Sequence, residues 1–273
     1  MNVLKEKLKQ GKTIIGAHIT LNDPAIGDIM GRIGNDFIWV DTEHSAIDYG
    51  TLQSMLISVS ANGTPTLVRV PWTDMTHVKR VLEQGPNAVI FPYVETPEDA
   101  ERLMKACIFP PIGTRGFGPV RALNYGLTDV DDFANGLIEN VARFIQIESK
   151  KGIENLPEIL KNPYIDGYVL GPNDLAASIG KLNRVFDPEV QELIDLCIKL
   201  VHDAGKPVGV STGSTDPNVL QFWYDKGCDI ISAGADYDHI REGALRECNT
   251  LREIVSKPRP AEKNRKFIAD FAK

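Results

Sequence analysis

Two short runs decide the fold of this chain: RFIQIES at residues 143–149 and GYVLGPND at residues 167–174. Each begins with apolar, β-branched or aromatic residues, which is typical of a buried strand, and each ends in a carboxylate, Glu148 or Asp174. The sequence between them is charged and has apolar residues at helical spacing, so the unit is predicted to be strand, helix, strand. A right-handed crossover makes two such strands parallel neighbours whose carboxyl ends share one edge.

The two acids at this shared edge suggest a divalent metal site. Hard cations such as Mg²⁺ and Mn²⁺ prefer oxygen ligands and usually keep water or substrate oxygens beside one or two carboxylates. Taken singly, an acid at a strand end can also cap the next helix, and Ser149 and Asp174 are both reasonable capping residues. Further polar groups at the same edge would favour a metal-binding role of these acids over a helix-capping role.

The composition is that of an ordinary globular protein. The 273 residues (30.1 kDa) include 42% hydrophobic and 25% charged residues, enough for one large core, and no composition break precedes a tail rich in Lys and Arg. We therefore expect a domain at residues 1–257 and a C-terminal tail at 258–273 that packs on a neighbouring subunit.

Charge and cysteine usage limit the partners. The formal net charge of −7 and the lack of a basic cluster with interleaved aromatics argue against nucleic acid. The N-terminus lacks the apolar core of a signal peptide and no later run is long enough to span a bilayer, so no membrane role and a cytoplasmic location are expected. The widely spaced cysteines form no CxxC pair, which fits a reducing compartment and not a zinc site.

Strand-like and helix-like segments alternate along the whole chain. The predicted strands cover residues 14–20, 37–41, 65–70, 88–94, 143–147, 168–171, 207–211 and 230–233. After an opening helix, the predicted helices cover residues 24–33, 49–62, 75–84, 97–107, 153–161, 188–204 and 217–226. Eight such repeats predict an α/β fold, a closed (β/α)8 TIM barrel with a C-terminal helical extension. A doubly wound sheet is the alternative, but ITLNDP at residues 19–24 is not its glycine-rich phosphate turn.

In a barrel, functional side chains gather where the strands end, and several other predicted strands end in polar residues. Asp41 precedes His44 by three residues, so its carboxylate could accept a hydrogen bond from one ring nitrogen and raise the basicity of the other. Arg69 ends an apolar strand, where it either meets a substrate oxyanion or forms a structural salt bridge. His18, near the end of the first strand, could also line the pocket.

A long insertion at residues 109–119, FPPIGTRGFGP, separates the fourth and fifth strands. A loop of this length, rich in glycine and proline, is often a lid or a substrate wall when it lies at the catalytic edge. A rigid structural connection is the alternative, and the sequence does not separate the two.

Taken together, these motifs resemble one family. They are Asp41-x-Glu43-His44, Val68-Arg69-x-Pro71, Pro111-x-Gly113-x-Arg115-Gly116, Gln146-x-Glu148 and Gly171-Pro172-x-Asp174-Leu175. In this order and spacing the chain resembles the class II pyruvate aldolases of the HpcH/HpaI family, which includes 4-hydroxy-2-oxoheptanedioate and 2-keto-3-deoxy sugar-acid aldolases. The resemblance extends from about residue 4 to residue 255.

The resemblance implies a metal-dependent barrel that reversibly cleaves a 4-hydroxy-2-oxo acid to pyruvate and an aldehyde. Glu148 and Asp174 would bind Mg²⁺, Mn²⁺ or Co²⁺. Gln146 and the backbone at Asn173 and Asp174 would hold the 2-oxo acid. The resemblance also implies that His44, assisted by Asp41, moves protons and that Arg69 stabilises the enolate. A homo-oligomer is expected, and a hexamer is one arrangement that the family suggests.

Two positions depart from the family pattern. Glu83 stands where the family usually has an aspartate that tunes the active-site histidine, so Glu83 is a candidate for that catalytic role. Residues 211–214, STGS, replace a more apolar stretch that helps to shape the aldehyde pocket.

Three alternative functions stay open. The same site could decarboxylate oxaloacetate, or the chain could resemble citrate lyase β-subunits and malyl-CoA lyases, although no basic nucleotide patch is evident. A barrel without activity that serves as a binding protein is the third. The sequence does not identify the aldehyde, the metal, the stereochemistry or the subunit count.

Overall fold

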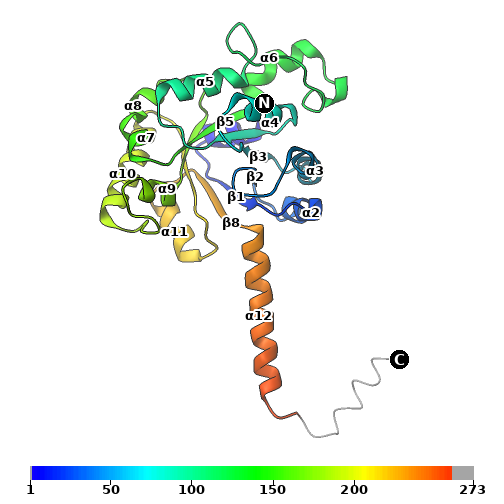
Figure 1. Cartoon of the computed structure of the whole chain (residues 1–273), viewed down its shortest axis with the longest axis vertical. Coiled ribbons are helices and arrows are strands. Elements are labelled where there is room, and N and C mark those ends of the chain that lie inside the picture. Colours follow the sequence, from blue (N-terminus) through cyan, green and yellow to red (C-terminus); the bar gives the residue numbers. More distant parts are fainter. Residues whose placement is uncertain (1, 260–273) are drawn as a thin grey trace. The chain divides into compact units, whose positions relative to one another are not determined.

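The computed structural model describes residues 2–259 and confirms the predicted barrel (Figure 1). Eight parallel strands pair in sequence order and close from the last to the first. They are β1 (Ile14–Ile19), β2 (Phe37–Asp41), β3 (Thr66–Arg69), β4 (Ala88–Phe91), β5 (Ala142–Ile147), β6 (Gly167–Leu170), β7 (Val208–Ser211) and β8 (Ile230–Ala235). All eight lie where alternation predicted them, with ends shifted by a few residues.

Helices connect the strands on the outside of the barrel. They are α1 (Val3–Lys9), α2 (Pro24–Arg32), α3 (Tyr49–Ser60), α4 (Met75–Glu83), α5 (Pro97–Cys107), α6 (Val130–Asn140), α7 (Lys150–Glu154), α8 (Leu156–Ile159), α9 (Pro172–Ser178), α10 (Pro188–Asp203), α11 (Pro217–Asp225) and α12 (Asp236–Ser256), with a short 3-10 helix η1 (Asn124–Gly126). Several begin at a cap followed by proline, as at Asp23 and Thr96, whose side chains accept from backbone N–H groups of the first turn.

One predicted helix, residues 153–161, is two short helices. Asn155 ends α7 and precedes α8, and Pro157 is the second residue of α8. Because proline has no N–H to donate to the preceding turn, a continuous helix is interrupted here. The helices α6 and α9 were not predicted, since each lies in sequence that also suited a loop.

The core has two parts. Inside the barrel, Phe37, Trp39, Leu67, Phe144 and Val169 form a buried cluster together with Leu4 of α1. A larger cluster fills the space between the outer faces of the strands and the helices. Its residues alternate along the strands with those that point inward, so most strand residues are buried on both sides of the sheet, with Ile15 of β1 as an exposed exception.

The glycine-rich insertion lies at the edge opposite to the one expected for a lid. It follows α5 and leads through α6 into β5, and at its end the N–H of Ala122 donates to the carbonyl of Glu83 at the end of α4. Helix ends and strand starts meet at the amino-terminal edge of the barrel. The lid interpretation is therefore wrong within this chain, and the segment is a structural connection whose Arg115 is buried.

Contacts divide the chain into two compact units, Met1–Asp236 and Tyr237–Lys273. The described part of the second unit consists of the rest of α12 and the residues up to 259, so residues 260–273 of the expected tail lie outside the described residues. Several large apolar side chains of α12 are exposed: Ile240, Leu245, Leu251, Ile254 and Val255. Between residues 2 and 259, no helix is both long and apolar enough to cross a bilayer.

Candidate active site

A cavity of about 330 Å³ opens at the carboxyl ends of the strands. It brings together six of the residues predicted for the site: His44, Arg69, Gln146, Glu148, Asn173 and Asp174. The end of β7 supplies Ser211 and the loop after it supplies residues 212–214, and four apolar side chains also line the wall: Val185, Phe186, Val219 and Trp223. These apolar residues were not predicted, because nothing in their local sequence distinguishes them from residues that pack in the core.

Glu148 is the most deeply buried acid of the cavity, with 4% of its surface exposed. It comes directly after β5, and its Oε1 accepts a hydrogen bond of 3.0 Å from the N–H of Tyr93. Burial raises the pKa of Glu148 to about 8, and the nearby carboxylates of Asp174 and Glu43 act in the same direction. The cavity thus concentrates negative charge that Arg69 only partly offsets.

Gly171 leaves the space that Glu148 occupies. A Cβ atom at residue 171 would lie 2.4 Å from Oε2 of Glu148, which is far inside the contact distance of two heavy atoms. The glycine of the Gly171-Pro172 motif is therefore needed at the end of β6 for a steric reason. The following turn, the start of α9, holds Asp174 at the rim.

Arg69 and Asp41 form a buried ion pair between neighbouring strands, opposite each other in the β2–β3 register. Nε of Arg69 donates to Asp41 over 2.9 Å, and its Nη2 donates to the second carboxylate oxygen. Burial alone would raise the pKa of Asp41, but the hydrogen bonds and charge of Arg69 hold it below its usual range. Arg69 also reaches the cavity, with Nη1 3.5 Å from the buried amide oxygen of Gln146.

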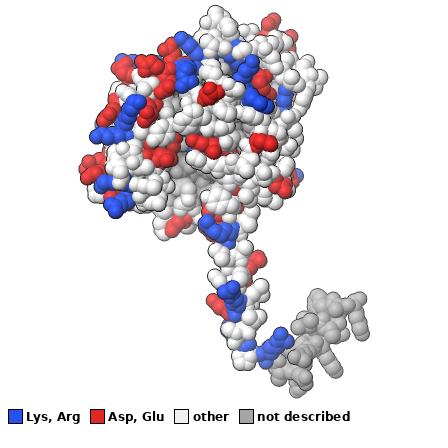
Figure 2. Space-filling view, viewed as in Figure 1, with Lys and Arg blue, Asp and Glu red and all other residues white. Residues whose placement is uncertain are grey.

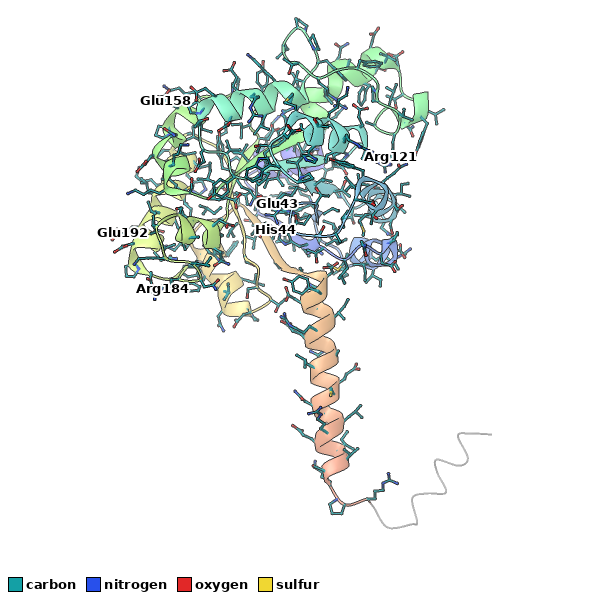
Figure 3. The ribbon with its side chains drawn as sticks, in the orientation of Figure 1. Glu43, His44, Arg121, Glu158, Arg184 and Glu192 are labelled. Atoms are coloured by element: carbon teal, nitrogen blue, oxygen red, sulfur yellow. The ribbon has the colours of Figure 1, made fainter. Side chains whose placement is uncertain are left out.

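This ion pair corrects the predicted role of Asp41. Its carboxylate was expected to accept from the ring of His44, but it accepts from Arg69 and from the backbone N–H groups of Glu43 and His44. The acid beside the ring is Glu43, whose Oε2 lies 3.7 Å from Nε2 of His44 and 3.1 Å from Nη1 of Arg69 (Figure 3). The Asp41-x-Glu43-His44 motif contains both acids that could lie beside the ring of His44. The geometry at the strand ends makes Arg69 the partner of Asp41 and leaves Glu43 beside the ring.

His44 itself lies in the loop after β2, and 66% of its side chain is exposed. It lines the mouth of the cavity, in contrast to Glu148 and Gln146 at the base. An exposed imidazole at the mouth can exchange protons with solvent and with a bound molecule.

Glu83 is the one predicted site residue that the chain does not bring to the cavity. It ends α4 at the amino-terminal edge of the barrel, where Oε1 lies 3.3 Å from Nη2 of the buried Arg115. The predicted pairing of Glu83 with His44 is therefore wrong within one chain, because the two residues lie at opposite edges.

The donor set of the cavity fits a hard divalent cation. Glu148 and Asp174 both present carboxylate oxygens, the oxygen donors that a hard cation prefers. Burial raises the pKa of Glu148, and a bound cation would favour its charged form. No cluster of three or more His, Cys, Asp and Glu side chains suited to a metal occurs within residues 2–259. A metal here would thus have two protein carboxylates and open positions for other oxygen ligands.

On the face shown in Figure 2, Asp and Glu side chains are interspersed with Lys and Arg, so this face does not carry charge of one sign alone.

A closed parallel barrel with acids, an arginine and an amide converging at the carboxyl ends of its strands defines a class of barrel enzymes that act on small oxygen-rich substrates. Comparison with known proteins specifies the family. The model of the HpcH/HpaI aldolase/citrate lyase family matches residues 15–243, and the chain belongs to this family of carbon–carbon lyases.

Named relatives and solved structures agree. The chain is 31% identical over 236 residues to a hydroxypyruvate/pyruvate aldolase of Roseobacter denitrificans, covering 86% of this chain and 91% of the relative. It is 31% identical over 237 residues to a 2-keto-3-deoxy-L-rhamnonate aldolase of Salmonella gallinarum, with coverage of 86% and 87%. A family structure from Burkholderia cenocepacia superposes with a TM-score of 0.87 at 28% identity, covering 92% of this chain and all of the other.

Proposed function

We propose that the chain is a metal-dependent class II aldolase that reversibly cleaves a 4-hydroxy-2-oxo acid to pyruvate and an aldehyde. The observation that carries the proposal is the convergence of Glu148 and Asp174 with Arg69 and Gln146 in one cavity of about 330 Å³. The names of the relatives, which are aldolases of pyruvate and of a 2-keto-3-deoxy sugar acid, support the same reaction class.

Glu148 and Asp174 are the residues that would hold the metal. When bound, Mg²⁺, Mn²⁺ or Co²⁺ would act as a Lewis acid toward a 2-oxo acid, a contribution of several kcal/mol. The nearness of Glu148, Asp174 and Glu43 supports this assignment, since Asp174 and Glu43 add to the effect of burial in raising the pKa of Glu148 and a cation would relieve their repulsion.

The chain's own residues would orient the substrate and move its protons. Gln146 and the backbone at Asn173 and Asp174 would position the 2-oxo acid. In cleavage, His44 takes the proton of the 4-hydroxyl group, the C3–C4 bond breaks, and its electron pair passes to the pyruvate fragment as an enolate. Arg69 offsets the enolate charge, and protonation of C3 then gives pyruvate.

Arg69 suits this role because Asp41 fixes it. Arg69 donates two hydrogen bonds to the carboxylate of Asp41, which hold the guanidinium plane, and its Nη1, 3.1 Å from Oε2 of Glu43, faces Gln146 and the cavity. A donor held in place before the reaction stabilises developing charge more than a mobile one, and one such donor is worth roughly 3 to 4 kcal/mol in other enzymes.

Removal of the metal tests the proposal directly. Exhaustive treatment with EDTA should abolish release of pyruvate from a 4-hydroxy-2-oxo acid, and Mn²⁺, Mg²⁺ or Co²⁺ should restore it. Release of pyruvate from oxaloacetate, measured in parallel, separates an aldolase from a decarboxylase. Activity that persists after exhaustive chelation would exclude the metal-dependent mechanism.

A homo-oligomer is part of the same proposal. The exposed apolar side chains of α12, among them Ile240, Leu245 and Leu251, support burial of this helix against another copy of the chain. Light scattering after size exclusion should give a multiple of 30.1 kDa, with a hexamer as the assembly suggested by family resemblance. A mass of one chain would refute it.

A further inference from the structure

His18 is a buried imidazole beside the cavity that the proposed reaction does not use. Only 7% of its surface is exposed, and its ring lies against Trp39 with 4.6 Å between ring centroids. Nδ1 lies 3.1 Å from the carbonyl oxygen of Ala233 in β8, and Nε2 lies 3.3 Å from Oγ of Ser211 in β7. The ring therefore connects the core of the barrel with a residue of the cavity wall.

The contacts of His18 determine which nitrogen carries the proton. A carbonyl oxygen can only accept, so Nδ1 must donate to Ala233. Oγ of Ser232, 3.2 Å from Nδ1, is placed to share this proton as a second acceptor. Burial lowers the pKa of His18 to about 4, so the ring is neutral near pH 7 and Nε2 is left without a proton.

A bare Nε2 determines the direction of the hydrogen bond to Ser211. The serine must donate its one hydroxyl proton to the ring, so its oxygen has only acceptor capacity left. Because Ser211 lines the cavity, this acceptor capacity is available to a bound molecule. A serine whose hydroxyl rotated freely would offer a donor as readily as an acceptor.

We propose that Ser211, oriented by His18, selects substrates that bring a hydroxyl group to this wall of the cavity. The inference rests on the proposed aldolase function and adds the substrate class. Such a hydroxyl can belong to the 2-oxo acid, as a hydroxymethyl group, or to the aldehyde. A methyl group in the same place would leave the acceptor of Ser211 unpaired. Ser211 is thus a specificity residue and His18 a positioning residue.

Matched pairs of substrates that differ only by methyl for hydroxyl test the proposal. Glycolaldehyde and propanal, each offered with pyruvate and Mn²⁺, probe the aldehyde. Hydroxypyruvate and 2-oxobutanoate, each offered with one aldehyde and Mn²⁺, probe the 2-oxo acid. The quantity to compare is the ratio of kcat/KM for the hydroxylated member to kcat/KM for its partner, in the wild type, in Ser211→Ala and in the control Ser54→Ala on the exposed face of α3.

We expect the wild type to prefer the hydroxylated member of one pair by roughly 3- to 10-fold, the usual effect of one neutral hydrogen bond. Ser211→Ala should remove the preference and Ser54→Ala should keep it. The pair that responds identifies which substrate carries the hydroxyl. If the wild type turns over both pairs and Ser211→Ala changes neither ratio, the inference is wrong while the aldolase proposal stands. If the wild type turns over neither pair, both proposals are wrong.

Two further measurements test His18 as a positioning residue. His18→Phe keeps a ring against Trp39 but removes the acceptor for Ser211, so it should lower the same ratio. In the Ser211→Ala background it should lower the ratio no further, whereas a purely structural role would reduce kcat/KM for both members alike. The ¹⁵N chemical shifts of the wild-type ring should show a protonated Nδ1 and a bare Nε2, and the opposite tautomer would overturn the proposal even if a variant failed to fold.

Discussion

The amino-terminal and carboxyl-terminal edges of the barrel both bury charged side chains, but they balance them differently. At the amino-terminal edge, Asp166 lies 2.9 Å from Nζ of Lys5 and 3.0 Å from Nη2 of Arg143. Backbone carbonyls of Ile138 and Tyr164 accept further hydrogen bonds from Arg143. At this edge two cations share one carboxylate, and backbone carbonyls supply further acceptors within the chain.

At the carboxyl-terminal edge, acids outnumber cations. Arg69 is shared by Asp41 and Glu43, while Glu148 is buried with one backbone N–H as its donor and Asp174 stands at the rim. An unbalanced buried charge is costly, so its presence indicates a function that needs it. This contrast supports the proposed metal site at the carboxyl-terminal edge and a structural role for the charges at the amino-terminal edge.

The substitution with the largest expected effect on the difference between the two edges is Glu148→Gln. The amide keeps the shape but removes the charge, so we expect cleavage to fall on the order of a thousandfold or more because the metal is lost. Without metal, the variant should unfold at a higher temperature than the wild type, since an uncompensated buried carboxylate is removed. Pyruvate release, Mn²⁺ titration and thermal unfolding in EDTA measure these effects.

The matched control for this variant is Glu192→Gln, an exposed acid on α10 at the periphery of the barrel (Figure 3). It should change neither activity nor metal affinity. A Glu148→Gln enzyme that keeps wild-type turnover would show that the acidic cavity is unrelated to the reaction.

Asp166→Ala should have the opposite consequence at the other edge. It leaves Lys5 and Arg143 without their shared carboxylate, so we expect a loss of about 3 to 4 kcal/mol in the free energy of unfolding, with normal activity in the folded fraction. Unfolding in urea measures this loss of stability. The exposed pair of Asp203 and Lys199 offers a control, since Asp203→Ala should cost less than about 1 kcal/mol. Equal losses in the two variants would contradict the contrast drawn between buried and exposed charge.

The third expected effect concerns the pH dependence of stability and tests whether His18 is buried as a neutral ring. Its pKa falls from 6.5 to about 4 in the folded chain because of burial, so the unfolded chain binds the proton more readily. The contribution of neutral His18 to the free energy of unfolding is complete above pH 6.5 and is lost as the pH falls toward 4, a change of about 3 kcal/mol. The measurement is the difference in unfolding free energy between wild type and His18→Phe across this range. A difference that does not vary with pH would show that His18 is not buried as a neutral ring.

The barrel was predictable because its signals are local and repeat. Eight apolar runs with β-branched residues, separated by helices with proline near their first position, leave few alternatives once parallel pairing is assumed. The edge at which the residue 109–119 insertion lies was not predictable from its length and glycine content. It depends on whether the segment follows a strand or a helix, and the predicted helix at residues 97–107 directly before it indicates the amino-terminal edge.

The site was predictable to the level of residues at strand ends but not to the level of contacts. Glu148, Asp174, Arg69 and Gln146 meet because parallel strands end at one edge. The choice of Asp41 as the partner of Arg69 depends on strand register, which places them side by side and is not evident in either segment alone. The apolar wall of the cavity comes from segments with no functional signal.

Gly171 has a consequence for how such a barrel can diversify. Any side chain larger than hydrogen at this residue would collide with Glu148 in its present position, so a substitution there requires the carboxylate to move. Ser211, on the neighbouring strand, lines the cavity and contacts His18 and not the acid, so a change of polarity there leaves Glu148 in place. New substrate preferences should therefore arise on the β7 side of the pocket, while the β6 turn stays fixed across descendants that retain the chemistry.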